Sequence, residues 1–335
     1  MKDSVAIVVL NWNGIKDTLK CLSSLQKQSY KNYEIILIDN NSTDNSKKIL
    51  LDYEKKHNNI HVIYSSKNYG FAGGVNIGIQ YSINKGFKYI SLFNNDAIAE
   101  ENWLKKLVES ISDPKVGICT GLFLKQNSKT IDSTGEQYSK WGLPFPRDRN
   151  YKVSKATKGG LVFGATGGAS LYRSELFTKI GLFDEDFFAY YEDVDISFRA
   201  QLAGWKVAYE PKAIAYHKQG ATASKLSGFA VYQTFKNLPL LFLKNVPREL
   251  LFSIGVRFYL AYVMMFFKAV INGSGKWATR GLFKSIILTP KKLRERHRIQ
   301  KLKQVKTNYI KDIIWQDLPP DQTGLRRLRK FFIGK

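Results

Sequence analysis

The first hundred residues repeat one order of features: an apolar segment, a polar turn and a helical pattern. Four short runs rich in β-branched and aromatic residues predict buried strands at positions 5–10, 33–38, 60–64 and 88–93. Helical patterns lie between them, such as the leucines at positions 19, 22 and 25. Strands that alternate with helices at this spacing predict an α/β fold with a doubly wound, mostly parallel sheet.

Polar side chains follow these predicted strands directly. Asn11, Asp39 and Asp96 each come at or just after a strand end. In an open α/β sheet the carboxyl edge of the strands is where ligands bind, so these residues predict a nucleotide crevice. A carboxylate such as Asp96, with no cation beside it in sequence, suits a hard divalent metal that carries a phosphate ligand. An alternative stays open here, in which Asp96 caps the helix that starts near Glu100.

A glycine-rich turn at positions 68–76 leads into the next helical pattern. It matches neither a dinucleotide-binding motif nor a Walker loop. Its glycines would serve either a tight helix entry with close packing or the approach of backbone N–H groups to a phosphate. We favour the second interpretation, because the turn shares the predicted sheet edge with Asp39 and Asp96. A second glycine cluster, Gly167–Gly168, precedes a predicted strand and would let a bulky ligand lie close to the backbone.

Six acidic residues fall within positions 184–195, interleaved with aromatic residues. If a helix begins near Glu192, several of them lie in its first turn, where the helix dipole favours negative charge. A carboxyl group among aromatic rings is also partly desolvated, which raises its pKa and makes it a better proton acceptor. Residues 126–158 predict a hairpin or long loop over the site, because glycines, prolines and charges interrupt the pattern. Strands are predicted at 205–208 and 213–216, and His217 follows the second. Such a histidine is more often a structural hydrogen-bonding group, but a metal at Asp96 would favour a ligand role.

Charge divides the chain into two parts. The net charge is +24, and residues 226–335 carry 22 Lys+Arg against 5 Asp+Glu. We therefore expect a domain at 1–225 and a basic helical region at 226–335 with an anionic partner, either a membrane surface or nucleic acid. The two cysteines have no metal-type spacing and no signal peptide is visible, so a reducing cytosol is expected.

The apolar stretch 250–271 is just long enough to span a bilayer. Arg257 lies within it, and a central arginine costs about 2.5–3.5 kcal/mol on insertion. With basic clusters at 291–298 and 326–330, the stretch predicts peripheral attachment to anionic lipid on the cytoplasmic membrane face. The alternative is a helical subdomain folded on the sheet, in which Phe242 and Leu251 pack inward.

Taken together, five motifs in residues 4–220 resemble the inverting glycosyltransferases of family two with the GT-A fold, in particular the rhamnosyltransferase-like branch of surface-polysaccharide assembly. They are Val-Val-Leu-Asn-Trp-Asn-Gly, Ile-Asp-Asn-Asn-Ser-Thr-Asp, Asn-x-Gly-Phe-Ala-Gly-Gly-x-Asn, Phe-Asn-Asn-Asp-Ala, and Tyr-Glu-Asp-Val-Asp followed by Gly-Trp and His217. The family's metal motif is usually Asp-x-Asp, and here its first position is Asn94. That departure makes a second ligand such as His217 more necessary.

The resemblance implies a role for each matching position. Asp193 would be the catalytic base, with Glu192 as the competing candidate, and Asp96 and His217 would hold Mg²⁺ or Mn²⁺. The implied nucleotide-binding residues are Asn11, Trp12, Asn13, Asp39, Gly73, Asn76 and Asn95. The implied donor- or acceptor-sugar residues are Gly167, Gly168, Glu192 and Trp205.

The implied donor is a dTDP- or UDP-linked sugar, and the implied acceptor is a surface-polysaccharide glycan carried on a polyprenyl diphosphate. The oligomeric state stays open.

Two other functions compete with the glycosyltransferase interpretation. A nucleic-acid-binding protein would explain the basic tail but not the polar strand ends, and no zinc-finger or RNA-recognition signature occurs, so no nucleic-acid partner is expected. A nucleotidyltransferase on a related sheet fits the Glu-Asp-x-Asp stretch and the Gly-Gly turn less well.

Overall fold

The computed structural model describes residues 3–126, 129–218, 227–320, 322 and 324. The strands are β1 Val5–Asn11, β2 Tyr33–Asp39, β3 Ile60–Tyr64, β4 Tyr89–Asn94, β5 Ala97–Ala99, β6 Val116–Lys125, β7 Ile131–Ser133, β8 Glu136–Tyr138, β9 Pro144–Pro146, β10 Gly160–Val162, β11 Ala169–Arg173 and β12 Lys206–His217. The α-helices are α1 Ile15–Leu25, α2 Ser46–Glu54, α3 Gly70–Asn84, α4 Trp103–Ser110, α5 Ser174–Ile180, α6 Glu192–Leu202, α7 Phe229–Asn245, α8 Arg248–Ile271, α9 Gly275–Lys301 and α10 Thr307–Ile313, with 3₁₀ turns η1 Val153–Lys155 and η2 Glu185–Phe187.

The described residues form one large sheet in the order β10-β12-β6-β11-β4-β1-β2-β3, with β5 paired to β12 and β7 to β6. Strands β3, β2, β1 and β4 pair in parallel, and β12 pairs in parallel with β6. β11 lies antiparallel between β4 and β6, so β6 and β12 run in the same direction as β4. The carboxyl ends of β1, β2, β4, β6 and β12 therefore meet at one edge, as the sequence predicts.

Helices cover both faces of this sheet, because successive side chains of a strand point to opposite faces. In β1, Val5, Ile7 and Val9 pack in a core with α1 and α4, whereas Ala6 and Val8 pack in a core with α3, α5 and α6. Glycines allow α3 to approach closely: a Cβ on Gly78 would lie 2.5 Å from Val8, and one on Gly74 would lie 2.5 Å from Leu10. Gly74 of the glycine-rich segment and Gly78 further along α3 therefore allow α3 to pack closely on β1.

One local prediction needs correction, and a second is confirmed only in part. The strands expected at 205–208 and 213–216 are one strand, β12, whose pairing with β6 is irregular between Glu210 and Ile214. The segment 126–158, expected as a hairpin or long loop, contains β7, the β8–β9 hairpin and η1. β7 extends the sheet beside the carboxyl end of β6, and so brings its residues to the predicted crevice.

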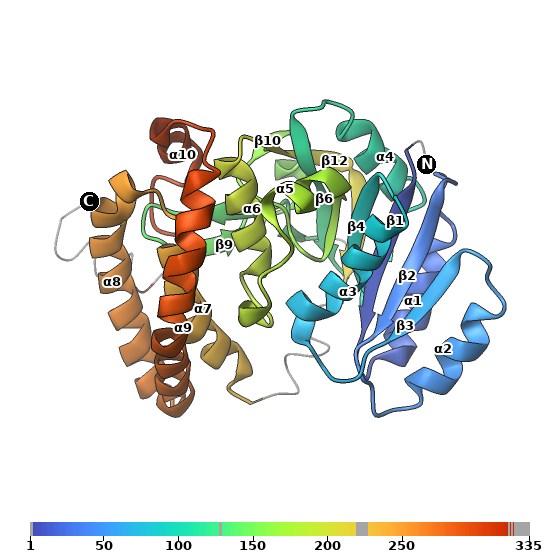
Figure 1. The fold of residues 1–335 in the computed structure, drawn as a ribbon, viewed down its shortest axis with the longest axis horizontal. Helices are drawn as coiled ribbons and strands as arrows, with labels where there is room; N and C mark the ends of the chain where they lie inside the picture. The colour runs from blue at the N-terminus through green and yellow to red at the C-terminus, as the bar shows by residue number, and fades with distance from the viewer. Residues whose placement is uncertain (1–2, 127–128, 219–226, 321, 323, 325–335) are drawn as a thin grey trace.

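The C-terminal helices α7–α10 pack together at the end of the molecule opposite β3 and α2 (Figure 1). They share a third core with α6 and the β8–β9 hairpin, in which Phe198 of α6 and Leu241 of α7 are fully buried. α7 is therefore part of the folded body, as the alternative of a packed helical subdomain expects. α8 and α9 contribute buried residues to the same core but also carry exposed apolar side chains.

Candidate active site at the carboxyl edge of the sheet

The predicted metal ligands come together at the ends of β4 and β12. Asp96 Oδ1 lies 3.1 Å from His217 Nε2, although the two residues are far apart in sequence. The side-chain exposures are 12% for Asp96 and 16% for His217, so both still reach solvent. Asn94 completes this corner, with its Nδ2 3.4 Å from the same ring nitrogen. The interpretation of Asp96 as a helix cap is not supported, because the cap of α4 is Asn102.

The other side of the His217 ring is held by a residue that the sequence did not indicate. His217 Nδ1 lies 2.7 Å from Oδ2 of Asp132, which is on β7 and is itself paired with Arg149 at 3.1 Å. Phe123 stacks on the imidazole with ring centroids 4.6 Å apart. Burial lowers the pKa of His217, but the hydrogen bonds to Asp132 and Asp96 raise it more, to about 9. The ring is thus fixed between two carboxylates.

This donor set fits a divalent cation. Asp132 is acceptor-only, so the N–H of Nδ1 donates to it, and Nε2 is the atom aimed at Asp96. A cation held by Nε2 and Asp96 would replace the proton that the raised pKa keeps on Nε2. Metal-binding histidines have this arrangement, with the second ring nitrogen bonded to a carboxylate. Mg²⁺ and similar ions are often held by one or two protein ligands together with substrate phosphates. Asp96 and His217 are the residues that would hold such an ion.

A chain of buried and partly buried hydrogen bonds joins this corner to the predicted nucleotide residues. Asn95 Nδ2 donates to Thr18 Oγ1 at 2.9 Å, and Thr18 Oγ1 donates to Asn11 Oδ1 at 2.8 Å. Asn11 Nδ2 then donates to Asp39 Oδ1 at 2.8 Å. The structure therefore places Asn11, Asp39 and Asn95 in one network. Thr18 is the linking residue that sequence reasoning missed, since a threonine inside a helix gives no local signal.

The other predicted nucleotide residues lie in different settings. Asn13 has a left-handed backbone, and its Oδ1 accepts from the N–H of Thr43 at 2.7 Å, which ties the end of β1 to the turn after β2. Trp12 is half-buried beside it. Asn76, in contrast, accepts from the N–H of Phe183 and donates to the Phe183 carbonyl, so its amide binds the chain's own loop. A Cβ on Gly73 would lie 2.8 Å from Tyr69.

The Gly167–Gly168 turn connects the metal corner to the predicted base. The N–H of Gly167 donates to Asp193 Oδ2 at 3.0 Å, and the carbonyl of Gly168 accepts from the N–H of Asn94 at 2.8 Å. A Cβ on Gly168 would lie 2.8 Å from Asn94 Nδ2, so no larger residue fits there without a shift. Asp193 and the end of β4 therefore flank the same short turn.

Glu192 and Asp193 open α6, but their carboxyl groups have different surroundings. Asp193 accepts from the N–H groups of Gly167 and, at 2.8 Å, Val194. Burial raises the pKa of Asp193, and these backbone hydrogen bonds oppose the rise. Glu192 is 7% exposed, and its Oε2 has no hydrogen-bond partner among the described residues. Burial and the neighbouring Asp193 raise the pKa of Glu192 to about 8. Asp193 is thus the carboxyl group better suited to be ionised near neutral pH.

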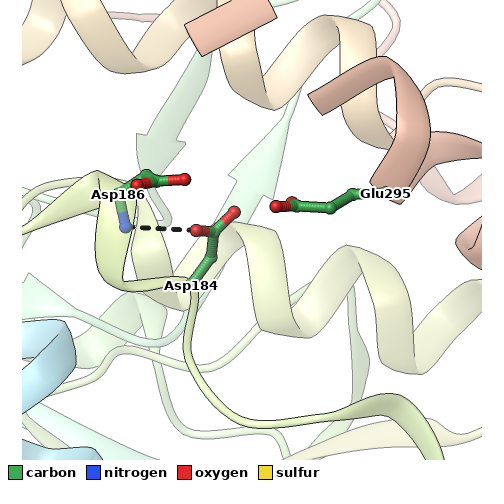
Figure 2. Close-up of side chains that lie close together, drawn as sticks. All are labelled: Asp184, Asp186 and Glu295. Carbon is green, nitrogen blue, oxygen red and sulfur yellow. Dashed lines mark hydrogen bonds between the residues drawn. The ribbon is translucent and has the colours of Figure 1, made fainter. Parts of the chain in front are cut away.

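A second group of carboxylates, Asp184, Asp186 and Glu295, could hold a cation by spacing, since one oxygen from each lies within 4.8 Å of the others (Figure 2). Lysine already fills that position. Lys292 Nζ lies 2.5 Å from Asp184, 2.7 Å from Asp186 and 2.9 Å from Glu295. Lys292 is completely buried, and its ammonium group supplies the charge that a metal would supply. This cluster thus connects α9 to the acidic stretch.

Trp205 is the predicted sugar-site residue that the structure separates from the others. It directly precedes β12, whose opposite end carries His217. Its ring packs against Gly117 and lies beside Lys179 Nζ, 5.1 Å from the ring centroid. The assignment of Trp205 to the sugar site is therefore a correction: a residue before a long strand lies at the sheet edge away from the crevice.

Comparison with known proteins agrees with the resemblance to family 2 glycosyltransferases. The family model described as glycosyl transferase family 2 matches residues 4–181, more than half of the chain. Glycosyltransferase GlyG of Streptococcus pneumoniae is 32% identical over 121 residues, which cover 36% of this chain and 39% of GlyG. The dTDP-rhamnosyl transferase RfbF of Shigella flexneri is 26% identical over 282 residues, which cover 76% of this chain and 87% of RfbF.

Solved structures share the fold. A Pyrobaculum calidifontis mannosyltransferase, PcManGT, in complex with GDP-Man and Mn²⁺, superposes with a TM-score of 0.54 at 13% identity, covering 85% of this chain and 86% of the other. GalNAc-T7 with UDP, GalNAc and Mn²⁺ gives a TM-score of 0.61 at 17% identity, covering 87% of this chain and 56% of GalNAc-T7.

Proposed function

The chain belongs to glycosyl transferase family 2 and has the GT-A fold, and from this premise we propose that it transfers a sugar from a nucleoside-diphosphate donor to a glycan hydroxyl with inversion. One observation carries the proposal. The Gly167–Gly168 turn contacts Asp193 on one side and the end of β4, just before Asp96, on the other. A proton acceptor and a candidate diphosphate site thus flank one backbone turn, and in this proposal the transferred sugar lies between them.

Asp193 is the general base of this reaction. The acceptor hydroxyl loses its proton to the Asp193 carboxylate while its oxygen forms a bond to the anomeric carbon. The bond from that carbon to the diphosphate oxygen breaks, and the nucleoside diphosphate leaves. One positioned base contributes about 10²–10⁴-fold to such a rate. The raised pKa of Glu192 favours its protonated form near neutral pH, which supports Asp193 rather than Glu192 as the base.

The donor lies along the carboxyl edge of β1, β2 and β4. Asn11 and Asp39, joined by a hydrogen bond, bind the nucleotide, and Asn95 connects them to the diphosphate end. Asp96 and His217 would hold Mg²⁺ or Mn²⁺, which neutralises charge on a diphosphate leaving group. The solved structures of PcManGT and GalNAc-T7, which have this fold, contain Mn²⁺, and this supports the assignment.

A dTDP-linked deoxyhexose such as rhamnose is the donor that we propose first, because RfbF matches over most of both chains. The test is a panel of radiolabelled dTDP-, UDP- and GDP-sugars with purified protein and a lipid-linked glycan acceptor. We expect sugar transfer with release of nucleoside diphosphate and an inverted anomeric centre. Release of pyrophosphate would instead indicate a nucleotidyltransferase, and no release with any donor would refute the proposal.

The same proposal includes attachment to the cytoplasmic face of a membrane through α8 and α9. One helix, α8, is long and apolar enough to span a bilayer by length and composition. One side of it nevertheless packs on the protein: Phe258 stacks on Phe242 of α7 with centroids 5.0 Å apart, and Tyr262 donates to the Phe235 carbonyl. Spanning would remove these contacts, so we favour an interfacial position.

The opposite side of α8 is apolar and continues onto α9. The exposed apolar side chains are Phe252, Val256, Tyr259, Leu260, Phe267, Val270 and Ile271 on α8, and Phe283, Ile286, Ile287 and Leu293 on α9. Exposed lysines and arginines alternate with them on α9, namely Lys276, Arg280, Lys284, Lys291, Arg294 and Arg298. Apolar side chains mixed with cations fit an anionic lipid interface. The basic cluster at 326–330 lies outside the described residues.

A further inference from the structure

The segment that precedes the proposed base has an unusual backbone. Phe188, Tyr190 and Tyr191 have φ angles of 63°, 71° and 71°, in the left-handed region that favours glycine. Tyr191 is the residue directly before α6, so Glu192 and Asp193 follow from this conformation. Non-glycine residues keep such angles only where the surrounding structure holds them. The direction in which α6 presents Asp193 therefore depends on what holds residues 187–191.

Neighbouring side chains of α7 hold this segment. Lys236 Nζ donates to the Phe187 carbonyl at 3.2 Å, and Asn237 makes the wider set of contacts. Asn237 Nδ2 lies within hydrogen-bond distance of three carbonyl oxygens, which share its two hydrogens: that of Phe187 at 3.0 Å, of Ala189 at 2.9 Å and of Tyr190 at 2.8 Å. Asn237 is completely buried. Three converging carbonyls require the NH₂ end of the amide, so the orientation of the side chain is defined by its partners. A single asparagine thus binds the three carbonyl groups that directly precede the left-handed residues Phe188, Tyr190 and Tyr191.

Further contacts hold the rest of the segment. On the sheet side, the N–H of Ala72 in α3 donates to the Phe188 carbonyl at 3.1 Å. On the helical side, Lys244 of α7 lies 2.6 Å from Asp184 and 3.0 Å from Asp195. The ion pairs hold the two ends of residues 184–195, and Asn237 holds the middle. α7 therefore contacts the base-bearing segment before, within and after its left-handed residues.

We propose that Asn237 is a positioning residue for Asp193, and that α7 is a required part of the active centre. The role rests on the proposed function, in which Asp193 is the base. α7 lies beyond residue 181, where the family match ends, so this contribution comes from the C-terminal helices. Without the three hydrogen bonds, the segment relaxes away from its left-handed angles and Asp193 loses its alignment with the acceptor hydroxyl.

The test compares Asn237→Leu with Gln233→Leu. Leucine has the same branched skeleton as asparagine but no N–H donor, so the first variant removes the hydrogen bonds, and Gln233→Leu places the same larger apolar side chain at a second buried position of α7. Gln233 is a matched control: it is a buried amide one turn earlier on α7, and no hydrogen bond from it to residues 183–191 occurs in the described part of the chain. Hydrogen–deuterium exchange of residues 183–195 is measured first, in the full-length protein without substrate.

We expect faster exchange in residues 183–195 for Asn237→Leu but not for Gln233→Leu. We also expect kcat per nucleotide-binding site to fall about 10²-fold, since misplacement of about 1 Å has that effect, with KM for the donor unchanged. If Asn237→Leu shows the same exchange rate in this segment as the wild type, or the same kcat per site, the proposal is overturned. If Asn237→Leu does not fold, Asn237→Ser, which retains one donor, should give intermediate values, and wild-type values for it would be equally decisive. A wild-type protein that transfers no sugar would refute the proposed function, while the exchange comparison would still decide whether Asn237 holds the segment.

Discussion

His217 and Asp132 lie 85 residues apart in sequence, yet His217 Nδ1 is 2.7 Å from Asp132 Oδ2. The contact leaves Nε2 of the same ring facing Asp96 at 3.1 Å. It forms because β7 pairs antiparallel with the carboxyl end of β6, next to the strand that carries His217. The pairing fixes both the rotation of the ring and the nitrogen that a metal would meet.

Asp132→Asn is therefore predicted to weaken Mn²⁺ binding about 10–100-fold, the usual effect of losing the hydrogen-bond partner of a metal-binding histidine. Isothermal titration with Mn²⁺ in the presence of nucleoside diphosphate measures it. Asp148→Asn is the control, because Asp148 binds Thr134 and Arg147 in the same region. Equal Mn²⁺ affinity in wild type and Asp132→Asn would contradict the prediction.

Removal of the metal should abolish sugar transfer. We expect no transfer in excess EDTA and recovery on addition of Mn²⁺ or Mg²⁺, because Asp96 and His217 alone do not neutralise a diphosphate leaving group. Asp96→Asn and His217→Ala should each reduce Mn²⁺ affinity in the binding assay. Full activity in EDTA, or a His217→Ala protein with unchanged metal dependence, would show that these residues do not hold the ion.

Asp193→Asn should leave nucleotide binding nearly intact and lower kcat by at least about 10²-fold, because it removes the proton acceptor but keeps the side-chain volume. Glu192→Gln resembles the protonated Glu192 of the native protein and should retain most activity. Steady-state kinetics and nucleotide titration of both variants decide the assignment. An active Asp193→Asn together with an inactive Glu192→Gln would transfer the role of base to Glu192.

The raised pKa of Glu192 predicts how the stability of the protein depends on pH. Burial, and then the neighbouring Asp193, raise the pKa of Glu192 from 4.5 to about 8 in the native state. Between these values the native protein keeps a proton that the unfolded chain has lost, so rising pH lowers the free energy of unfolding. Glu192→Gln removes this dependence. As pH rises from 5 to 8, the free energy of unfolding of the variant should therefore increase relative to that of the wild type, by a few kcal/mol at pH 8. Thermal melting of both proteins between pH 5 and 9 measures the difference. A constant difference across that range would contradict the raised pKa.

The exposed apolar face of α8 and α9 should bind anionic vesicles. We expect wild-type protein to sediment with phosphatidylglycerol-containing vesicles and to be released by high salt or carbonate. Phe252→Glu with Phe283→Glu should abolish sedimentation, because both side chains are more than half exposed and would carry charge into the interface. Deletion from Leu226 onward is not a suitable test, since it removes α7 from the shared core. Retention after carbonate would indicate that α8 spans the bilayer, and tight binding to polynucleotide without vesicle binding would favour a nucleic-acid partner.

Most of the fold could be predicted because its signals are local. The runs that form β1 to β4 are apolar on both faces, as strands covered on both sides must be, and the glycine and asparagine turns mark where they end. The common edge follows from parallel pairing alone, so Asn11, Asp39 and Asp96 could be placed together before any contact was known. The irregularity within β12 and the pairing of β7 with β6 had no comparable signal.

By itself, the sequence determined the order of strands and helices, the edge where polar residues gather and the candidate roles of Asp96, Asp193 and His217. The tertiary structure alone decided which partners these residues have. Asp132 pairs with His217, and Asn237 binds the segment before Asp193. Asp184 and Asp186 form ion pairs with Lys292, and Trp205 lies away from the site. The physical reason is that side-chain periodicity encodes which face of a helix or strand is buried. A hydrogen bond between residues distant in sequence depends instead on how the helices and strands pack, and the neighbouring residues in the sequence do not indicate it.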